Sequence, residues 1–149
     1  MKKILQVALG IAVTAAPAWA ALGQSADSVK ADHERMGGTL RAQQFTGYMV
    51  HEISQPDGHV VREYVSPAGL VFGVVWDGPT MPDLSLLLGS YMGQLQKAMA
   101  ASSTPRRHGP LYMQAGNLVV VSGGHLRSFH GRAYLTNLIP AGLTEAVLR

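Results

Sequence analysis

Residues 45–76 have the sequence FTGYMVHEISQPDGHVVREYVSPAGLVFGVVW, which predicts three β-strands joined by two tight turns. The turns are expected at QPDG and SPAG, where proline presets the backbone for a turn and glycine tolerates the conformation that follows. The third apolar run is uninterrupted, which is typical of a strand covered on both faces. The stretch therefore predicts an antiparallel meander, with strands over 45–53, 59–65 and 70–76.

A helix is predicted after this meander, over residues 83–99. Thr80 can cap its start, and Pro82 lies in the first turn, where a missing backbone N–H does no harm. Leucines and other apolar residues then recur at helical spacing, which gives the helix one apolar face. A second, shorter helix is expected before the meander, over residues 25–36, because two glycines end its pattern.

A further group of strands is predicted near the end of the chain, after a polar and flexible loop at 100–109. These strands are expected over 111–115, 118–121 and 125–135, with turns at GN and SGG. The predicted order is therefore α-βββ-α-βββ. Antiparallel strands with helices on one face form an α+β fold, here two three-stranded meanders packed against one main amphipathic helix.

The first twenty residues are expected to be a signal peptide. Two lysines precede an apolar run over 4–16, and the small-residue pattern Ala-Trp-Ala predicts cleavage between Ala20 and Ala21. The run is too short for a membrane anchor, since spanning the ~30 Å hydrocarbon core takes about 20 residues. The sequence therefore predicts a signal peptide at 1–20 and a single exported domain at 21–149, periplasmic or secreted, with no transmembrane segment.

The composition excludes several classes of function. The 149-residue chain has no cysteine, which excludes a disulfide framework, a cysteine-ligated metal and a thiol nucleophile. Its formal charge is +3, from 12 basic and 9 acidic residues, and removal of the two lysines of the signal peptide lowers it to +1. A nearly neutral domain lacks the basic surface that binds nucleic acid, so we expect no nucleic-acid partner.

The predicted strands present a problem of charge burial. On the last strand Arg127 and Arg132 lie on opposite faces, so either face buries an arginine, and Arg62 and Glu63 raise the same difficulty on the second strand. One hypothesis is structural, an inward ion pair of Arg127 with Glu63 or Asp77. The alternative is an open sheet face that binds an anionic or sugar-like ligand. Its candidate binding residues are Arg62, Tyr64, Trp76, Arg127, Arg132 and Tyr134.

No catalytic or metal-binding motif is complete. The sequence HEISQ at 51–55 resembles a zinc-protease motif but has glutamine where the second histidine is needed, and it lies in a predicted strand. Pairing of the first two strands is expected to place His51 opposite Arg62. An enzyme would need three residues to converge, from the set His51, His59, His125, His130, Glu52 and Glu63. We therefore expect no metal and no cofactor.

Two segments carry a family resemblance. These are VHEISQPDGHVVREYVSPAGLVFGVVWDGPTMPDLSLLLGSY at 50–91 and LVVVSGGHLRSFHGRAYL at 118–135. They resemble a proteobacterial family known as domain of unknown function 2844. The resemblance covers essentially the whole mature chain and implies a small exported protein, but it brings no catalytic residue, cofactor or substrate.

The leading hypothesis from the sequence is a non-enzymatic periplasmic or secreted domain that binds a protein or cell-envelope partner through its sheet face or edge. The rival is a hydrolase or metal-dependent enzyme whose histidine and carboxylate site the spacing does not reveal. A third hypothesis is an assembly subunit that pairs through an exposed strand.

Overall fold

The structure is a computed structural model that describes residues 22–102 and 110–149. The expected signal peptide and its cleavage point between Ala20 and Ala21 lie outside the described residues. Most of the loop expected at 100–109 lies outside them too. Within the described part of the chain, no helix is long and apolar enough to cross a membrane.

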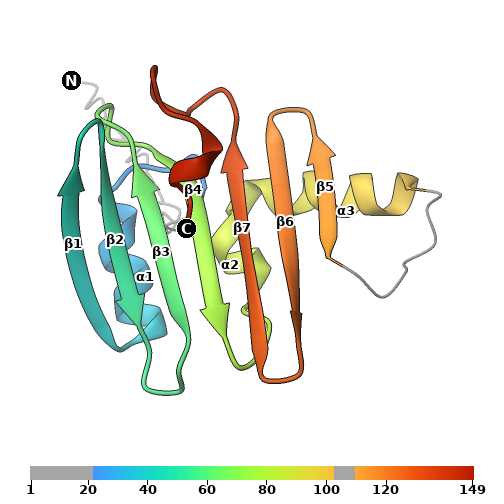
Figure 1. Cartoon of the computed structure of the whole chain (residues 1–149), viewed down its shortest axis with the longest axis horizontal. Helices are drawn as coiled ribbons and strands as arrows, with labels where there is room; N and C mark the ends of the chain where they lie inside the picture. Colours follow the sequence, from blue (N-terminus) through green and yellow to red (C-terminus); the bar gives the residue numbers. More distant parts are fainter. Residues whose placement is uncertain (1–21, 103–109) are drawn as a thin grey trace, which may run out of the picture.

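A single antiparallel sheet of seven strands forms the body of the protein, in the order β1-β2-β3-β4-β7-β6-β5. Pairing of β4 with β7 joins the two halves of the chain into this one sheet (Figure 1). The edge strands are β1 and β5. The strand bounds are Thr39–Phe45 (β1), Tyr48–Ser54 (β2), Val60–Val65 (β3), Val71–Gly78 (β4), Leu111–Ala115 (β5), Leu118–His125 (β6) and Ser128–Leu135 (β7).

The main helices all cover the same face of the sheet (Figure 1). They are α1 (Ser28–Met36) and a helical run made of α2 (Leu84–Leu88), the short 3₁₀ helix η1 (Gly89–Tyr91) and α3 (Met92–Ala101). Asp83, not Thr80, caps this run, because its carboxylate accepts a hydrogen bond of 2.9 Å from the Ser85 amide. The apolar face predicted for 83–99 packs on the sheet through Leu87, Leu88 and Leu95, all at most 2% exposed.

The opposite face of the sheet, which we call the outer face, is covered in part by the C-terminal segment, residues 136–149. This segment contains the 3₁₀ helix η2 (Glu145–Val147) and crosses in front of the sheet in Figure 1. A second apolar cluster lies beneath it and includes Tyr64, Phe72 and Leu148. The sheet is thus covered by helices on one face and only partly covered on the other.

Two expectations about the strands are wrong. The first run has four strands rather than three, because residues 39–45 form β1, so the two three-stranded meanders are not observed. Nearly every side chain of β1 is exposed, and an edge strand of this kind lacks the apolar alternation that predicts strands. The predicted turn at 122–124 lies inside β6, and the chain turns instead at Leu126 and Arg127, where Arg127 has a φ of 69°.

Candidate functional site

A row of directly paired residues crosses the outer face, and we call it the charged row. Strand register places Arg41 opposite Glu52, and Glu52 opposite Arg62. The row continues through Val75 to Arg132. Cross-strand partners lie about 5 Å apart, so Arg41, Glu52 and Arg62 form a row of alternating charge, and of these three, among the described residues, only Glu52 and Arg62 form an ion pair. Strand register therefore places these charged residues in one row across the outer face.

Arg62 is the centre of the charged row. Its Nε donates to Glu52 Oε2 at 2.8 Å, and its Nη1 donates to Asp77 Oδ2 at 3.0 Å. Burial alone would lower the pKa of Arg62, but its hydrogen bonds to the two carboxylates outweigh this effect and the pKa is raised. Since 27% of the Arg62 side chain is exposed, solvent screens part of this interaction. Both carboxylates are nevertheless held in fixed positions by one guanidinium.

Aromatic rings lie beside the charged row. Phe45 and Tyr48, which face each other across β1 and β2, stack with ring centroids 5.0 Å apart and an angle of 8°. Tyr48 also stacks on Tyr64 at 5.9 Å, and Tyr64 meets Phe72 edge to face. Burial raises the pKa of Tyr64. The stack leaves Phe45 at the edge of the sheet, 38% exposed.

The C-terminal segment is tied to this face at its last described residue. The Tyr64 hydroxyl donates to the Arg149 carbonyl oxygen at 2.6 Å and accepts from the Arg149 amide at 3.1 Å. Arg132 donates from Nη1 to the Leu148 carbonyl oxygen at 3.2 Å. Leu148 packs over Gly73, where any Cβ would lie 2.6 Å from a Leu148 methyl carbon. Gly73 therefore allows the segment to lie close to the sheet.

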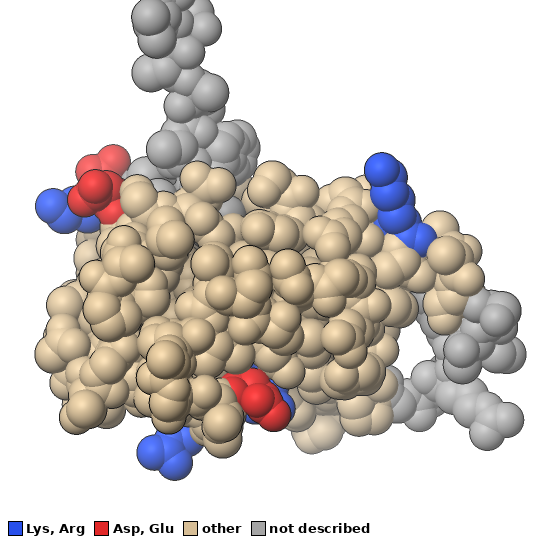
Figure 2. Space-filling view, turned by 90° about the horizontal axis from the view of Figure 1, so that it is seen from above, with Lys and Arg blue, Asp and Glu red and all other residues tan. Residues whose placement is uncertain are grey.

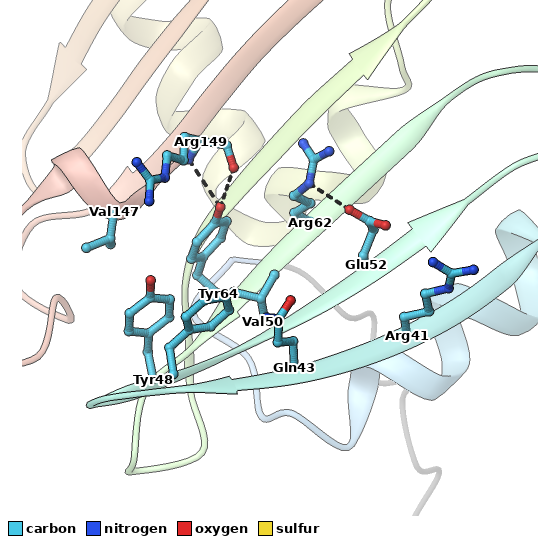
Figure 3. A pocket seen from close by; sticks show the side chains of 10 residues that line it. Arg41, Gln43, Tyr48, Val50, Glu52, Arg62, Tyr64, Val147 and Arg149 are labelled. Atoms are coloured by element: carbon cyan, nitrogen blue, oxygen red, sulfur yellow. Dashed lines mark hydrogen bonds and ion pairs between the residues drawn. The ribbon is translucent and has the colours of Figure 1, made fainter.

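These features enclose a hollow of about 270 Å³, which we call the arginine hollow. Its polar lining residues come from β1, β2, β3 and the end of the chain (Figure 3). In Figure 3 the Arg41, Glu52 and Arg62 side chains rise from neighbouring strands, with Tyr48 and Tyr64 on the side of the C-terminal segment. The lining residues are Arg41, Gln43, Phe45, Tyr48, Val50, Glu52, Arg62, Tyr64, Val147 and Arg149.

A second hollow of about 360 Å³ lies beside Arg149 and is lined by residues of β4, β7 and β6. Its polar side chains include Asp77, His130 and Arg132. Arg149 lines both hollows, and the Arg62–Asp77 ion pair links the lining of one to that of the other. Figure 2, which views the molecule from above, shows mostly uncharged residues, with acidic and basic side chains side by side in two places and a few basic side chains standing alone.

Four of the six residues proposed from the sequence for a binding face share the outer face. Register places Arg62, Tyr64, Arg132 and Tyr134 there. Trp76 lies on the helix-covered face and is 1% exposed. The six residues therefore do not form one surface.

The proposed ion pairs of Arg127 are wrong. Arg127 is exposed in the β6–β7 turn, because the chain reverses three residues later than the glycine pattern predicts. Asp77 pairs with Arg62 instead. Glu63 is 1% exposed and lies on the helix-covered face, so it is not part of the charged row.

The sequence reasoning missed Arg41, Tyr48 and Arg149 as candidates. The signal for Arg41 is the two-residue period of Arg41, Gln43 and Phe45, which places all three on one face once β1 is recognised as a strand. No local pattern indicates Arg149, because only the path of the C-terminal segment across the sheet brings it to the hollow.

The histidines of the described part of the chain do not gather into a metal site. Among residues 22–102 and 110–149, no group of three histidine, cysteine or acidic residues could hold a metal ion. The expected pairing of His51 with Arg62 is wrong by one position, since His51 lies opposite Glu63. Burial lowers the pKa of His51, which favours its neutral form.

His59 does make a chain of polar contacts at one end of the sheet. Its Nδ1 lies 3.0 Å from Asp57 Oδ2, and its Nε2 lies 2.9 Å from the Thr80 hydroxyl. Hydrogen bonds from His59 lower the pKa of Asp57. Carboxylate, imidazole and hydroxyl occur in this order in serine hydrolases. However, the His59 Nε2 also lies 3.2 Å from the Thr80 carbonyl oxygen, and neither hollow described above contains these residues.

Comparison with known proteins identifies one relationship. A family model described as "Protein of unknown function (DUF2844)" matches residues 18–148, nearly the whole chain. None of the curated proteins and none of the solved structures matches.

Proposed function

The chain belongs to the DUF2844 family of proteins of unknown function, and from this starting point we propose that it is an exported protein that binds a ligand or envelope partner on its outer face. The proposed location is the periplasm or the exterior, after cleavage between Ala20 and Ala21. The support for export is the lysine pair, short apolar run and Ala-Trp-Ala triplet of the first twenty residues.

One observation carries the binding proposal: the arginine hollow is open, polar and positively charged on the face that the helices leave uncovered. Three arginines and one acidic residue line it, and Asp77 pairs with Arg62 from outside the lining, so one net positive charge remains and favours a ligand with negative charge. Its size is slightly below the ~300–1,000 Å³ typical of small-molecule sites, and polar groups converge on it from several strands. Binding is favoured over catalysis because Arg62 holds both neighbouring carboxylates in ion pairs.

Export is tested by expressing the full chain and separating the cell fractions. We expect the protein in the periplasm or medium, with the mass of a chain that begins at Ala21. A protein that keeps residues 1–20 and remains with the membrane would contradict this part of the proposal.

Binding is tested by thermal unfolding of the mature protein with a panel of acidic sugars, neutral sugars, phosphates and acidic peptides. A ligand present at 100 times its dissociation constant stabilises the folded state by about 2.7 kcal/mol. We expect one class to raise the midpoint, and the charge reversal Arg41→Glu to abolish this shift. Arg127→Glu is the matched control, because Arg127 is exposed in a turn outside both hollows. Equal shifts in both variants would exclude the arginine hollow.

A hydrolase is the second candidate function, favoured by the Asp57–His59–Thr80 contacts. In such an enzyme the Thr80 oxygen would attack the carbonyl carbon of an ester or amide while His59 takes its proton, and His59 would return that proton to the leaving alcohol or amine as the scissile bond breaks. Water would then release the acyl group from Thr80. The test is labelling of Thr80 by a fluorophosphonate probe, located by mass spectrometry. Labelling that the isosteric change Thr80→Val removes would establish a reactive hydroxyl. An unlabelled Thr80 would remove this candidate.

A further inference from the structure

We propose that the arginine hollow is a subsite for a sugar that carries a carboxylate, a uronic acid, and that the C-terminal Arg149 completes this subsite. The inference rests on the proposed function, because it names the chemical class of the ligand that the outer face binds. Its support comes from the unpaired cations, the acceptors beside them and the shape of the lining.

Two arginines of the hollow are available to an anion. Within residues 22–102 and 110–149, neither Arg41 nor Arg149 forms an ion pair with a carboxylate, and both are exposed. Arg62 differs, because Glu52 and Asp77 already hold its guanidinium. A guanidinium binds a carboxylate with two parallel hydrogen bonds, which makes arginine well suited to this group. The available charge thus lies at two sides of the hollow, on β1 and at the end of the chain.

The same hollow also has acceptors, which a simple anion could not use. Glu52 presents a carboxylate whose Oε2 bonds to Arg62, and Gln43 and Tyr48 add an amide and a hydroxyl to the lining. Inorganic phosphate would meet repulsion from Glu52, since it offers mainly acceptor oxygens. A sugar acid supplies both an oxyanion for the arginines and hydroxyl donors for Glu52. The mixed lining therefore favours a uronic acid over a bare phosphate.

The dimensions and apolar parts of the lining agree with a sugar. Adjacent strands lie about 4.8 Å apart, so the backbones of Arg41 on β1 and Arg62 on β3 are roughly 10 Å apart across the sheet, with Glu52 on β2 between them. A sugar ring would therefore lie over Glu52, with an arginine on either side. The volume of about 270 Å³ suits one or two rings. Ring edges of Tyr48 and the side chain of Val147 give the apolar contact that the C–H groups of a sugar need.

The second hollow extends the subsite. Because Arg149 lines both hollows, a chain of uronic acids that starts in the arginine hollow can continue past Arg149 toward Arg132. Arg132 donates from Nη1 to the Leu148 carbonyl oxygen at 3.2 Å and to the Glu145 carbonyl oxygen at 3.4 Å, and keeps its other donors. We therefore expect a short oligouronate to bind more tightly than a single uronic acid.

The test is isothermal titration of the mature protein with glucuronate and with a trimer of uronic acids. Glucose and inorganic phosphate serve as comparison ligands. We expect the trimer to bind, glucose and phosphate to bind at least tenfold more weakly, and added salt to weaken the trimer's binding. Arg41→Gln and Arg149→Gln should each weaken the trimer's binding about tenfold or more, because each loses a charge-assisted pair of hydrogen bonds.

Arg127→Gln is the matched control, with the same loss of charge outside both hollows, and it should bind as the parent does. All three variants remove exposed side chains, so their unfolding midpoints should match the parent and exclude misfolding. Binding that is equal in Arg41→Gln, Arg149→Gln and Arg127→Gln would overturn the proposal. If glucose, phosphate or an acidic peptide binds the outer face and the uronic acids do not, the proposed function survives and this inference fails. If nothing binds the outer face, both fail.

Discussion

Replacement of Gly131 by alanine tests whether the Trp76 side chain lies on the helix-covered face of the sheet. Gly131 lies opposite Trp76 in β4 and opposite Ser122 in β6. A Cβ at this position would lie 2.5 Å from Trp76 Cε2 and 2.8 Å from the Val121 carbonyl oxygen. Both distances are shorter than real Cβ contacts, so either the indole ring or the backbone has to move.

The size of the effect follows from the surroundings of Trp76. The ring is 1% exposed and packed among residues of the helix-covered face, so it cannot turn away into solvent. Inserting a methyl group into a filled core costs about 1–3 kcal/mol, and we expect Gly131→Ala to lie near 3 kcal/mol. In a domain of this size about 1 kcal/mol changes the midpoint of thermal unfolding by ~4 °C, so the expected fall is about 12 °C.

The assay is urea and thermal unfolding followed by circular dichroism. Gly93→Ala is the matched control, because a Cβ at Gly93 in α3 meets nothing within 4 Å. This change should be neutral or stabilise the protein by up to about 1 kcal/mol, since alanine favours the helix. A second check is Trp76→Phe, which removes the atoms that the new Cβ meets, so Gly131→Ala should cost less in that background. A Gly131→Ala protein as stable as the parent would refute the placement of Trp76 on the helix-covered face.

Three further outcomes are expected. Asp83→Ala should destabilise the protein by about 1 kcal/mol, as for the loss of a helix N-cap. Hydrogen bonds from Ser85 lower the pKa of Asp83, so the stabilisation by the Asp83 carboxylate is present above the ordinary carboxyl pKa of 3.8 and is lost as the pH falls through the lower pKa of the folded state. Urea unfolding at neutral and acidic pH would measure this loss, and an equal cost of the substitution at both pH values would count against the cap. Tyr64→Phe should lower the free energy of unfolding by about 1 kcal/mol and speed amide hydrogen exchange over residues 145–149, because it removes both hydrogen bonds to Arg149. Unchanged exchange over these residues would show that this contact does not hold the C-terminal segment. If the protein assembles by pairing through an exposed edge strand, its mass in light scattering should rise with protein concentration. The substitution Gln43→Pro in β1 should abolish this rise. A monomer mass at every concentration would exclude assembly through an edge strand.

Local patterns in the sequence predicted much of the sheet. The strands within 45–76 were predictable because apolar residues alternate or run together between turns with proline and glycine. The helical run over 84–101 was predictable from its leucine spacing, although Gly89 interrupts it with a φ of 51°. These features depend on neighbouring residues, which is why one sequence is enough to find them.

The predictions that failed concern features that depend on contacts between distant segments of the chain. β1 was missed because an exposed edge strand has no buried face to mark it. The register of β2 and β3 differs from the expected one by one position, and a shift of one residue exchanges which side chains share a pair. It is this shift that places Glu52, rather than His51, opposite Arg62.

The candidate site was only partly predictable for the same reason. Six residues were proposed as one binding face, and register places four of them, Arg62, Tyr64, Arg132 and Tyr134, on the outer face. Trp76 lies on the helix-covered face and Arg127 lies in a turn. Arg149 could not be proposed, because it lies 85 positions from Tyr64 in the sequence and reaches it only when the C-terminal segment crosses the sheet. Binding by these residues stays a prediction.

The most direct measurement of whether the outer face binds ligand is an amide chemical-shift titration of the ¹⁵N-labelled mature protein with the uronic acid trimer. We predict that the largest changes map to the outer-face positions of β1, β2 and β3 and to residues 147–149, and that amides of α1 and α3 change little. Saturating changes confined to the helices or to the β5 edge, or spectra that do not change at all, would contradict the account.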